Sequence, residues 1–487
     1  MQSLAPFRLA ILASAVLLTA CGGNDDDPPA AEETRAQDAR VFTPVALDNP
    51  TAYPDAVGTT SFAALTGATV NTDRWAGVLN GAAYRIEVPE NWNGKLVMYA
   101  HGYRGTVPNL TTGNPSIRRY LIENGYAWAA SSYSTNWYDV RTGVEDTNAL
   151  ALAFRSIAAE RGRTLAAPTR TYITGHSMGG HVAAAAVETE ALNTARNRVR
   201  YDGAAPMCGV TGDTELFNTF AAMQVSAQAV AGIPRYPTAN FADIKPIVDA
   251  TLFSRLTTPV TPTVGRGQQY ASIVENLTGG QRPLFDVALA YGGSFGSSYG
   301  TFGSDGTVNG ILNRSVLDTN RFTYTIEGDP TASAAINAAA LDLTAVPDAN
   351  RLRRDGLRWI PKVNGEFSVP VVSIHTLGDL FVPFSMMQIH RQRAEANGNG
   401  DRLVTRAIRG ISHCDFTVAE QVEAFADLVD WVENGNKPAG DDVLTAATVA
   451  QPTYGCTFTR APVVGVDASS TITLRGLVAG APDGACP

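Results

Sequence analysis

Short apolar runs alternate with amphipathic stretches along most of the chain. Residues 83–88 alternate polar and apolar side chains, as in a half-buried strand, and residues 95–100 are nearly all apolar, as in a central strand covered on both faces. Further strands are predicted at residues 126–133, 171–174, 199–208, 369–375 and 402–408. Helices are predicted at residues 145–160, 182–187 and 385–395. This alternation predicts an α/β fold with a mostly parallel central sheet and helices on both faces.

The alternation is interrupted over residues 211–360, where helical stretches at 217–230 and 268–277 alternate with Gly-, Pro- and Thr-rich loops. We therefore expect the core to be built from two separated halves with an insertion between them. The predicted parts are a first half of the core at 46–210, the insertion at 211–360, a second half of the core at 361–438 and a C-terminal extension at 439–487 with weak strand patterns.

The N-terminal residues predict an export signal. Residues 1–20 contain one Arg followed by the apolar stretch 9–18, which has the length of a signal-peptide core and is too short to span a bilayer. Leu18-Thr19-Ala20-Cys21 resembles a bacterial lipobox, which implies that Cys21 is lipid-modified and anchors the mature chain in the outer membrane. The alternative is an ordinary cleavable signal with an incidental cysteine. Residues 21–45 are acidic and contain Pro, as expected of a solvated tether.

Composition narrows the possible partners. The 487 residues are 45% hydrophobic, enough for a large core, and the net charge of −9 without a basic cluster argues against nucleic acid. No His-Glu-x-x-His or Cys-x-x-Cys pattern occurs, so we expect no metal and no cofactor.

Residues 170–181 carry the strongest chemical signal. A short buried strand is followed by Gly175-x-Ser177-x-Gly179 and then by the Ala-rich helical run. A strand that reverses into a helix this sharply holds its central residue in a strained conformation with the side chain outward, and a Cβ two positions away on either side would collide with backbone. Ser177 is therefore the candidate nucleophile.

Two further matches to this pattern are predicted to be decoys. They centre on Ser294 and Ser298, in a Gly/Ser-rich run with no helix-forming segment after it. We expect a flexible loop there, and replacement of either serine by Ala should do little.

The surroundings of Ser177 resemble the α/β-hydrolase fold. The strand at 95–100 runs into His101-Gly102-Tyr103, similar to the loop that donates a backbone N–H to the oxyanion hole of these enzymes. The resemblance implies Tyr103 and Met178 as the two backbone donors. It also implies that the insertion after the sixth strand is a lid over the active site; an ornament away from the cleft is the alternative.

A serine nucleophile needs a base and a carboxylate that orients the base. Asp379 follows the seventh predicted strand and His413 follows the last, which gives the nucleophile-acid-histidine order of the fold. Of six histidines, only His413 is on a loop at a strand's C-terminal end and downstream of the acid. Asp202 lies within its strand and Asp415 is too near His413 in sequence, so Asp379 is the predicted acid.

These residues predict an extracytoplasmic serine esterase that cleaves carboxylic esters through an acyl-enzyme on Ser177. A serine peptidase or amidase with the same triad is one alternative. A surface lipoprotein whose hydrolase fold only binds is another, and the retention of all three triad residues argues against it. Expected partners are a small or polymeric ester substrate and, through the lipid anchor, a membrane.

The four remaining cysteines are Cys208, Cys414, Cys456 and Cys486. An even count in an exported chain favours disulfides. Because Cys208 ends the strand beside the nucleophile strand, on the rim that the His413 loop must cross, we expect a Cys208–Cys414 bond and a Cys456–Cys486 bond; free buried thiols are the alternative. His413-Cys414 also resembles the feruloyl esterase and tannase family, in which bonded cysteines stand directly before the serine and after the histidine, but here His176 precedes the serine.

Overall fold

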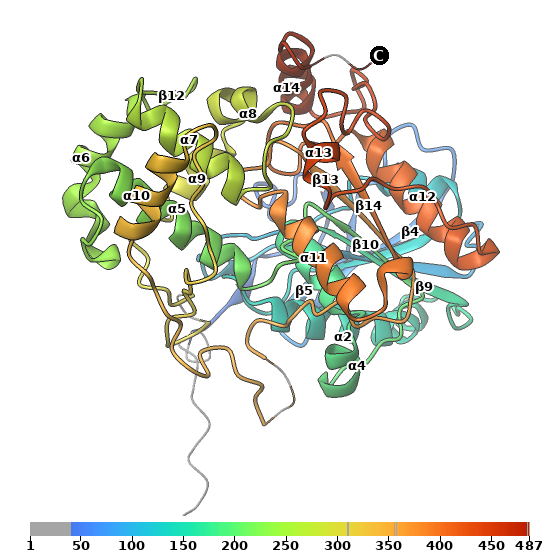
Figure 1. The fold of residues 1–487 in the computed structure, drawn as a ribbon. Helices are drawn as coiled ribbons and strands as arrows, with labels where there is room; N and C mark the ends of the chain where they lie inside the picture. The colour runs from blue at the N-terminus through green and yellow to red at the C-terminus, as the bar shows by residue number, and fades with distance from the viewer. Residues whose placement is uncertain (1–39, 309–310, 355, 357, 485, 487) are drawn as a thin grey trace, which may run out of the picture. The chain divides into compact units, whose positions relative to one another are not determined.

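An eight-stranded mixed sheet forms the centre of the protein (Figure 1). The computed structural model describes residues 40–308, 311–354, 356, 358–484 and 486. In sheet order the strands are β14 (Leu403–Ile408), β13 (Val371–Thr376), β10 (Gly203–Met207), β9 (Arg170–His176), β6 (Lys95–Ala100), β8 (Ala127–Ser131), β5 (Ala82–Pro89) and β4 (Thr72–Leu79). Neighbours are parallel except at the β4–β5 and β5–β8 pairs.

Helices cover both faces of the sheet, which explains why β10, β13 and β14 are buried along their whole length. On one face lie α2 (Val140–Glu160), α3 (Met178–Ala185) and α11 (Ser385–Ala396), and on the other lie α1 (Arg118–Glu123) and α12 (Val418–Asn434). The strand order, the crossovers and the turn between β9 and α3 confirm the predicted α/β-hydrolase fold.

The register brings the predicted site residues to one edge of the sheet. Ala100 at the end of β6 pairs with Gly175 of β9, and Met207 at the end of β10 pairs with His176. Thr376 and Ile408, the last residues of β13 and β14, also pair with each other. The loops that follow these parallel strands therefore leave the sheet side by side.

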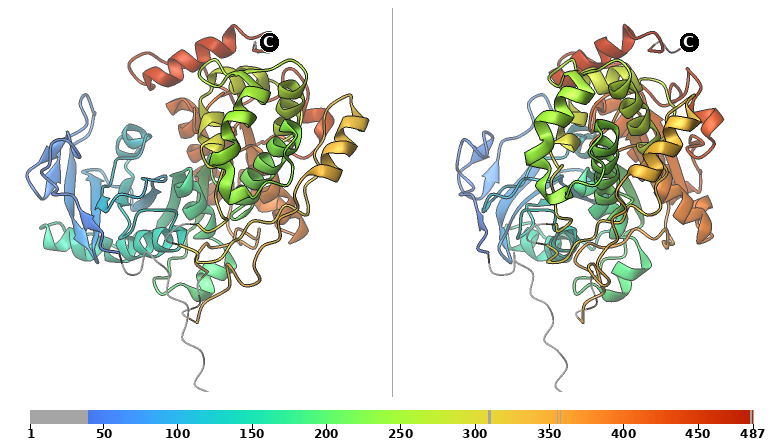
Figure 2. Two further views of the ribbon diagram at one scale, coloured as in Figure 1. Left: turned by 90° about the vertical axis from the view of Figure 1, so that its left-hand side faces the viewer. Right: turned by 60° about the vertical axis from the view of Figure 1, so that its left-hand side comes forward.

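A helical insertion separates β10 from β13. It contains α5 (Glu215–Ala231), α6 (Phe241–Leu252), α7 (Arg266–Leu277), α8 (Phe285–Tyr291), α9 (Ser294–Tyr299), α10 (Pro330–Ala339) and a short antiparallel pair, β11 (Phe253–Arg255) and β12 (Thr261–Pro262). Its helices pack on one another around a hydrophobic core of their own, and Figure 2 shows them grouped together in green and yellow. Phe285, Phe295 and Tyr299 are buried in this core rather than in a substrate pocket.

Two local predictions are wrong. The Gly/Ser-rich run is not a flexible loop, because residues 294–299 form α9, with Phe295 and Tyr299 one turn apart on its buried face. The C-terminal extension contains two helices, α13 (Ala446–Val449) and α14 (Ser469–Ala479), instead of strands. β-branched residues suggested strands there, but helical spacing buries Thr471, Arg475 and Val478 on one face.

The remaining elements are short. They are α4 (Thr189–Thr194), the 3₁₀ turns η2 (Thr238–Asn240) and η3 (Gly400–Arg402), and the strands β1 (Thr43–Pro44), β2 (Ala56–Val57), β3 (Ser61–Phe62) and β7 (Asn109–Leu110). Within the described ranges, no helix is both long and apolar enough to cross a bilayer. The predicted signal peptide, Cys21 and most of the tether lie outside the described residues.

Candidate active site

Ser177 occupies the sharp turn between β9 and α3. Its backbone dihedrals, φ 58° and ψ −123°, are strained for a residue with a side chain. The flanking glycines are sterically required: a Cβ on Gly175 would lie 2.6 Å from the carbonyl oxygen of Ala100, and one on Gly179 would lie 2.7 Å from that of His101. The sequence thus forms the elbow that exposes the serine hydroxyl.

Ser177, His413 and Asp379 form a continuous hydrogen-bonded relay. The Nε2 atom of His413 lies 2.8 Å from Ser177 Oγ, and its Nδ1 atom lies 2.6 Å from Asp379 Oδ2. A carboxylate only accepts, so Nδ1 carries the proton and Nε2 is free to accept from the serine hydroxyl. The structure therefore brings together the three residues that the sequence proposed as a triad.

Asp379 itself is held by backbone. Its carboxylate is fully buried, and Oδ1 accepts the N–H groups of Phe381 at 2.9 Å and Val382 at 3.0 Å. The competing acids are engaged elsewhere: Asp202 accepts the N–H of Thr171, and Asp415 lies 3.6 Å from a guanidinium nitrogen of Arg475. Asp379 is the carboxylate that reaches the ring of His413.

The other five histidines, all among the described residues, make no hydrogen bond to the Ser177 hydroxyl; four of them are buried and His176 is partly buried. Burial lowers the pKa of His101 and His390 to about 3 and that of His176 and His181 to about 4. Burial also lowers the pKa of His375, whose Nε2–H donates to the carbonyl of Val382. Because the pKa of each ring is lowered, these histidines stay neutral at physiological pH.

The loop after β6 lies against the nucleophile. A Cβ on Gly102 would be 3.2 Å from Ser177 Cβ, so this loop passes as close as a glycine allows. Met178 is the first residue of α3, and first-turn N–H groups have no partner within their helix. Both segments that carry the proposed oxyanion donors, the backbones of Tyr103 and Met178, therefore flank Ser177.

An apolar pocket of about 330 Å³ opens at Ser177. The described residues that line it come mainly from the loop after β6, the loop before α2, the insertion and the loop after β13 that carries Asp379 (the acid loop). None of them is charged. They are Tyr103, Trp137, Tyr138, Ser177, Val210, Leu216, Phe217, Phe220, Ala221, Gln224, Thr301, Ser304, Thr307, Val308, Leu317, Phe381 and Val382. The aromatic residues that the insertion contributes to the pocket are Phe217 and Phe220. The sequence analysis did not single them out.

Both predicted disulfides are present. Cys208 is bonded to Cys414, with 5.3 Å between their Cα atoms, and Cys456 is bonded to Cys486. The first bond joins the end of β10 to the residue after His413. Cys208, Cys414 and His413 are also the described residues grouped closely enough to suggest metal ligands, but two sulfurs joined in a disulfide offer no thiolate.

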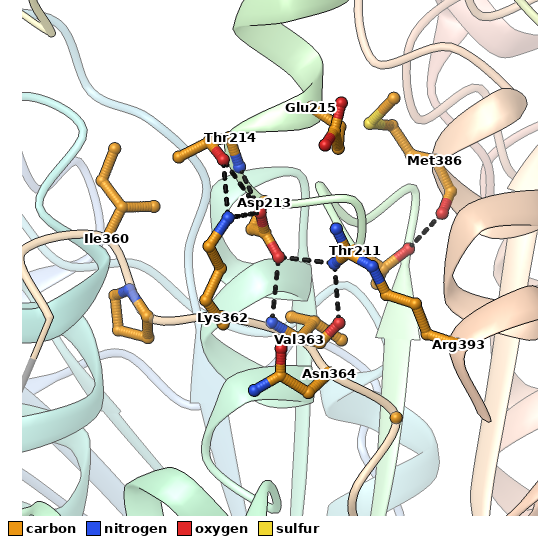
Figure 3. A network of polar contacts seen from close by, with 12 residues as sticks. Thr211, Asp213, Thr214, Glu215, Ile360, Lys362, Val363, Asn364, Met386 and Arg393 are labelled. Atoms are coloured by element: carbon orange, nitrogen blue, oxygen red, sulfur yellow. Dashed lines mark hydrogen bonds and ion pairs between the residues drawn. The ribbon is translucent and has the colours of Figure 1, made fainter. Parts of the chain in front are cut away.

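Asp213 is a buried carboxylate that bonds to the segment in which the chain returns from the insertion (Figure 3). The sequence analysis did not identify it. Asp213 accepts from Lys362 Nζ at 2.8 Å, the N–H of Val363 at 3.1 Å and the Arg393 guanidinium at 2.6 Å. Burial opposes ionisation, but the cations Lys362 and Arg393 outweigh it and lower the pKa of Asp213. The partners lie about 150 and 180 residues away, so no local pattern signals them.

The segment in which the chain returns from the insertion, which includes Pro361, Lys362 and Val363, is also linked to the pocket-lining Tyr138 through His181. Its Nε2 faces the carbonyl of Pro361 at 2.8 Å and must donate, so Nδ1 accepts the hydroxyl proton of Tyr138 at 2.9 Å. His181 lies on α3, one turn after Ser177. The elbow helix, the return segment and a pocket-lining ring are thereby fixed together.

The comparisons with known proteins are distant. No family model matches the chain. The chain is 23% identical over 442 residues to the o-phthalyl amidase of Xanthobacter agilis, covering 77% of this chain and 90% of that protein. Feruloyl esterase B of Aspergillus oryzae is similar in structure with a TM-score of 0.42 and 15% identity, covering 82% of this chain and 86% of that one. The rice cell wall degrading esterase LipA of Xanthomonas oryzae has a TM-score of 0.32 and 13% identity, covering 73% of this chain and 86% of that one.

Proposed function

We propose that this protein is a serine hydrolase that cleaves carboxylic ester bonds through an acyl-enzyme on Ser177. The observation that carries this proposal is the relay from Asp379 through His413 to Ser177, at 2.6 and 2.8 Å, at the wall of an apolar pocket. A serine hydroxyl is a weak nucleophile until a positioned base removes its proton, and this arrangement supplies that base.

In the proposed reaction, His413 Nε2 takes the proton of Ser177 as Oγ attacks the substrate carbonyl. The N–H groups of Tyr103 and Met178 stabilise the oxyanion, and Asp379 stabilises the imidazolium that forms. His413 then gives the proton to the leaving alcohol, and an acyl-enzyme remains. Water, activated by the same histidine, releases the acid and restores Ser177.

The lining of the pocket favours a substrate with a neutral, apolar acyl group. Three of its polar side chains donate to other groups of the protein: the hydroxyl of Thr301 to Ser298, that of Thr307 to Asp305, and the amide of Gln224 to Gln228 and Thr238. A carboxylate buried here would lose its hydration without gaining an opposite charge, because none of the described lining residues is charged. An alkyl or aryl acyl group would bury apolar surface against Phe217, Phe220 and Phe381.

Amide hydrolysis is the second candidate, because the relative with 23% identity is named as an amidase. The same groups serve both reactions, since His413 would protonate a leaving amine as it would an alcohol. An ester and an amide of the same acid separate the two possibilities.

The test is a substrate panel with an active-site label. The protein should hydrolyse 4-nitrophenyl butyrate and benzoate, and it should react with a fluorophosphonate at Ser177. Its kcat/KM for the mono-4-nitrophenyl ester of terephthalic acid should be at least about 100-fold below that for 4-nitrophenyl benzoate. The reason is that the free carboxylate of the terephthalate ester would be buried in the apolar pocket. Butyryl and benzoyl anilides test the amidase alternative. Labelling of another serine would refute the assignment, and inactivity on all substrates would favour a binding lipoprotein.

The location of the protein is a related proposal. Two disulfides indicate an extracytoplasmic protein. We further propose the outer-membrane anchor suggested by Leu18-Thr19-Ala20-Cys21, in which acylated Cys21 begins the mature chain. The native protein should partition into detergent and Cys21→Ser should not, as phase separation would show. Mass spectrometry that finds an unmodified N-terminus at another residue would exclude the anchor.

A further inference from the structure

The loop that carries Asp379 is shared between the sheet and the insertion. It begins where β13 ends, and the residue directly after the acid is Leu380. The side chain of Leu380 is fully buried and belongs to the hydrophobic core of the insertion, together with Leu289 and Phe295. The residue that follows the proposed triad acid is thus packed by the insertion rather than by the sheet.

Both backbone polar groups of Leu380 bond to serines of α9. Ser294 Oγ accepts the N–H of Leu380 at 3.0 Å, and the hydroxyl of Ser298 donates to its carbonyl. Both serines are buried, and their spacing of four places them on one face of the helix. Phe295 and Tyr299, one position further along in each case, face the core of the insertion. α9 therefore joins the acid loop with one face and its own core with the other.

A buried arginine holds the other side of the acid. Arg282 Nε donates to the carbonyl of Leu377 at 2.7 Å, while its other nitrogens bond to Gly280 and Thr278. Burial lowers the pKa of Arg282 to about 10, so the guanidinium remains charged at neutral pH. These three partners and a fourth, the carbonyl of Glu275 at 3.2 Å, fix its orientation between the insertion and the acid loop.

The acid loop is closely packed at Gly378. A Cβ on Gly378 would lie 2.6 Å from the Cβ of Ala288 in α8 and 2.6 Å from the Cα of Ile411 in the loop that carries His413. α8, the acid loop and the histidine loop are thus in direct contact at this glycine. Movement of the insertion at this edge would move the acid loop with it.

We propose that the insertion positions the triad acid, with Ser294, Ser298 and Arg282 as positioning residues. This rests on the proposed function. Asp379 bonds to His413 through Oδ2 and to its own loop through Oδ1, so a displaced loop misplaces the hydrogen bond that orients the imidazole. The proposal reverses the expectation, drawn from the sequence, that these two serines are dispensable.

Removing either hydroxyl should lower kcat and leave KM nearly unchanged. Ser298→Ala and Ser294→Ala should each reduce kcat about 10- to 100-fold, the effect of a small misplacement of a catalytic group, because neither serine is at the proposed nucleophile. Ser297→Ala is the matched control, since Ser297 is on the same helix but exposed, and it should behave as the native protein. Thermal unfolding identifies any variant that does not fold; if one serine variant fails, the other still tests the proposal.

A double-mutant cycle with Asp379→Asn separates positioning from a general structural role. If the serines act through the acid, adding Ser294→Ala or Ser298→Ala to Asp379→Asn should change kcat by less than about twofold. Full additivity in this cycle, or native kcat in both single variants, would overturn the proposal. An Asp379→Asn variant with native kcat would instead refute the proposed function, so the two failures are distinguishable.

Discussion

Ser177→Ala and His413→Ala should each lower kcat by at least about 10³ with the fold intact, because the members of a catalytic triad act as a unit. In the proposed reaction the serine supplies the nucleophile and the histidine its base, and Ser177 Oγ lies 2.8 Å from His413 Nε2. The measurement is steady-state hydrolysis of a 4-nitrophenyl ester of a neutral acid, with circular dichroism to verify folding.

Combining the two substitutions gives a sharper result. The Ser177→Ala/His413→Ala double variant should be no slower than either single variant within about threefold, since the first substitution already removes the mechanism. Exchange of His390 for Ala is not a suitable control, because that ring is fully buried beside Phe367. Ser297→Ala serves as the surface control. A Ser177→Ala variant with native activity would mean that another residue carries the nucleophile.

The sequence was sufficient for the parts of the site that depend on local order. Gly175 and Gly179 signal the elbow because the turn excludes a Cβ at both positions. Parallel strands deliver their C-terminal loops to one edge, so Asp379 and His413 could be placed opposite Ser177 from chain order alone. The Cys208–Cys414 bond followed from the same reasoning.

Contacts made across the insertion could not be predicted in this way. Asp213 is paired with Lys362 and Arg393, and nothing near any of these residues in the sequence indicates the others. Ser294 and Ser298 looked like parts of a loop because Gly and Ser disfavour helices in isolation, whereas burial of adjacent aromatic rings overrides that preference. The missing information was tertiary packing, which local propensity does not contain.

Removal of the Cys208–Cys414 disulfide should reduce both stability and activity. The bond closes a span of 206 residues, which corresponds to about 5 kcal/mol in the chain-entropy model as an upper value. It also ties the residue after His413 to the end of β10, whose last residue pairs with His176. Cys208→Ala/Cys414→Ala should therefore unfold at lower denaturant concentration and show a reduced kcat at temperatures where it remains folded.

The second disulfide is a matched control for this experiment. The Cys456–Cys486 bond closes only 30 residues, for which the same model gives about 3.5 kcal/mol. It lies in the C-terminal extension, which contacts the His413 loop through noncovalent interactions such as the hydrogen bond from Arg475 to the carbonyl of Asp415 at 2.6 Å. Cys456→Ala/Cys486→Ala should lose stability but keep a higher kcat than Cys208→Ala/Cys414→Ala, because the covalent bond at Cys414 remains. Because both variants lose one disulfide, the difference in kcat measures the added effect of a covalent bond at the residue after His413. Equal loss of kcat in both variants, or native kcat in the first, would show that the Cys208–Cys414 bond stabilises the chain without positioning His413.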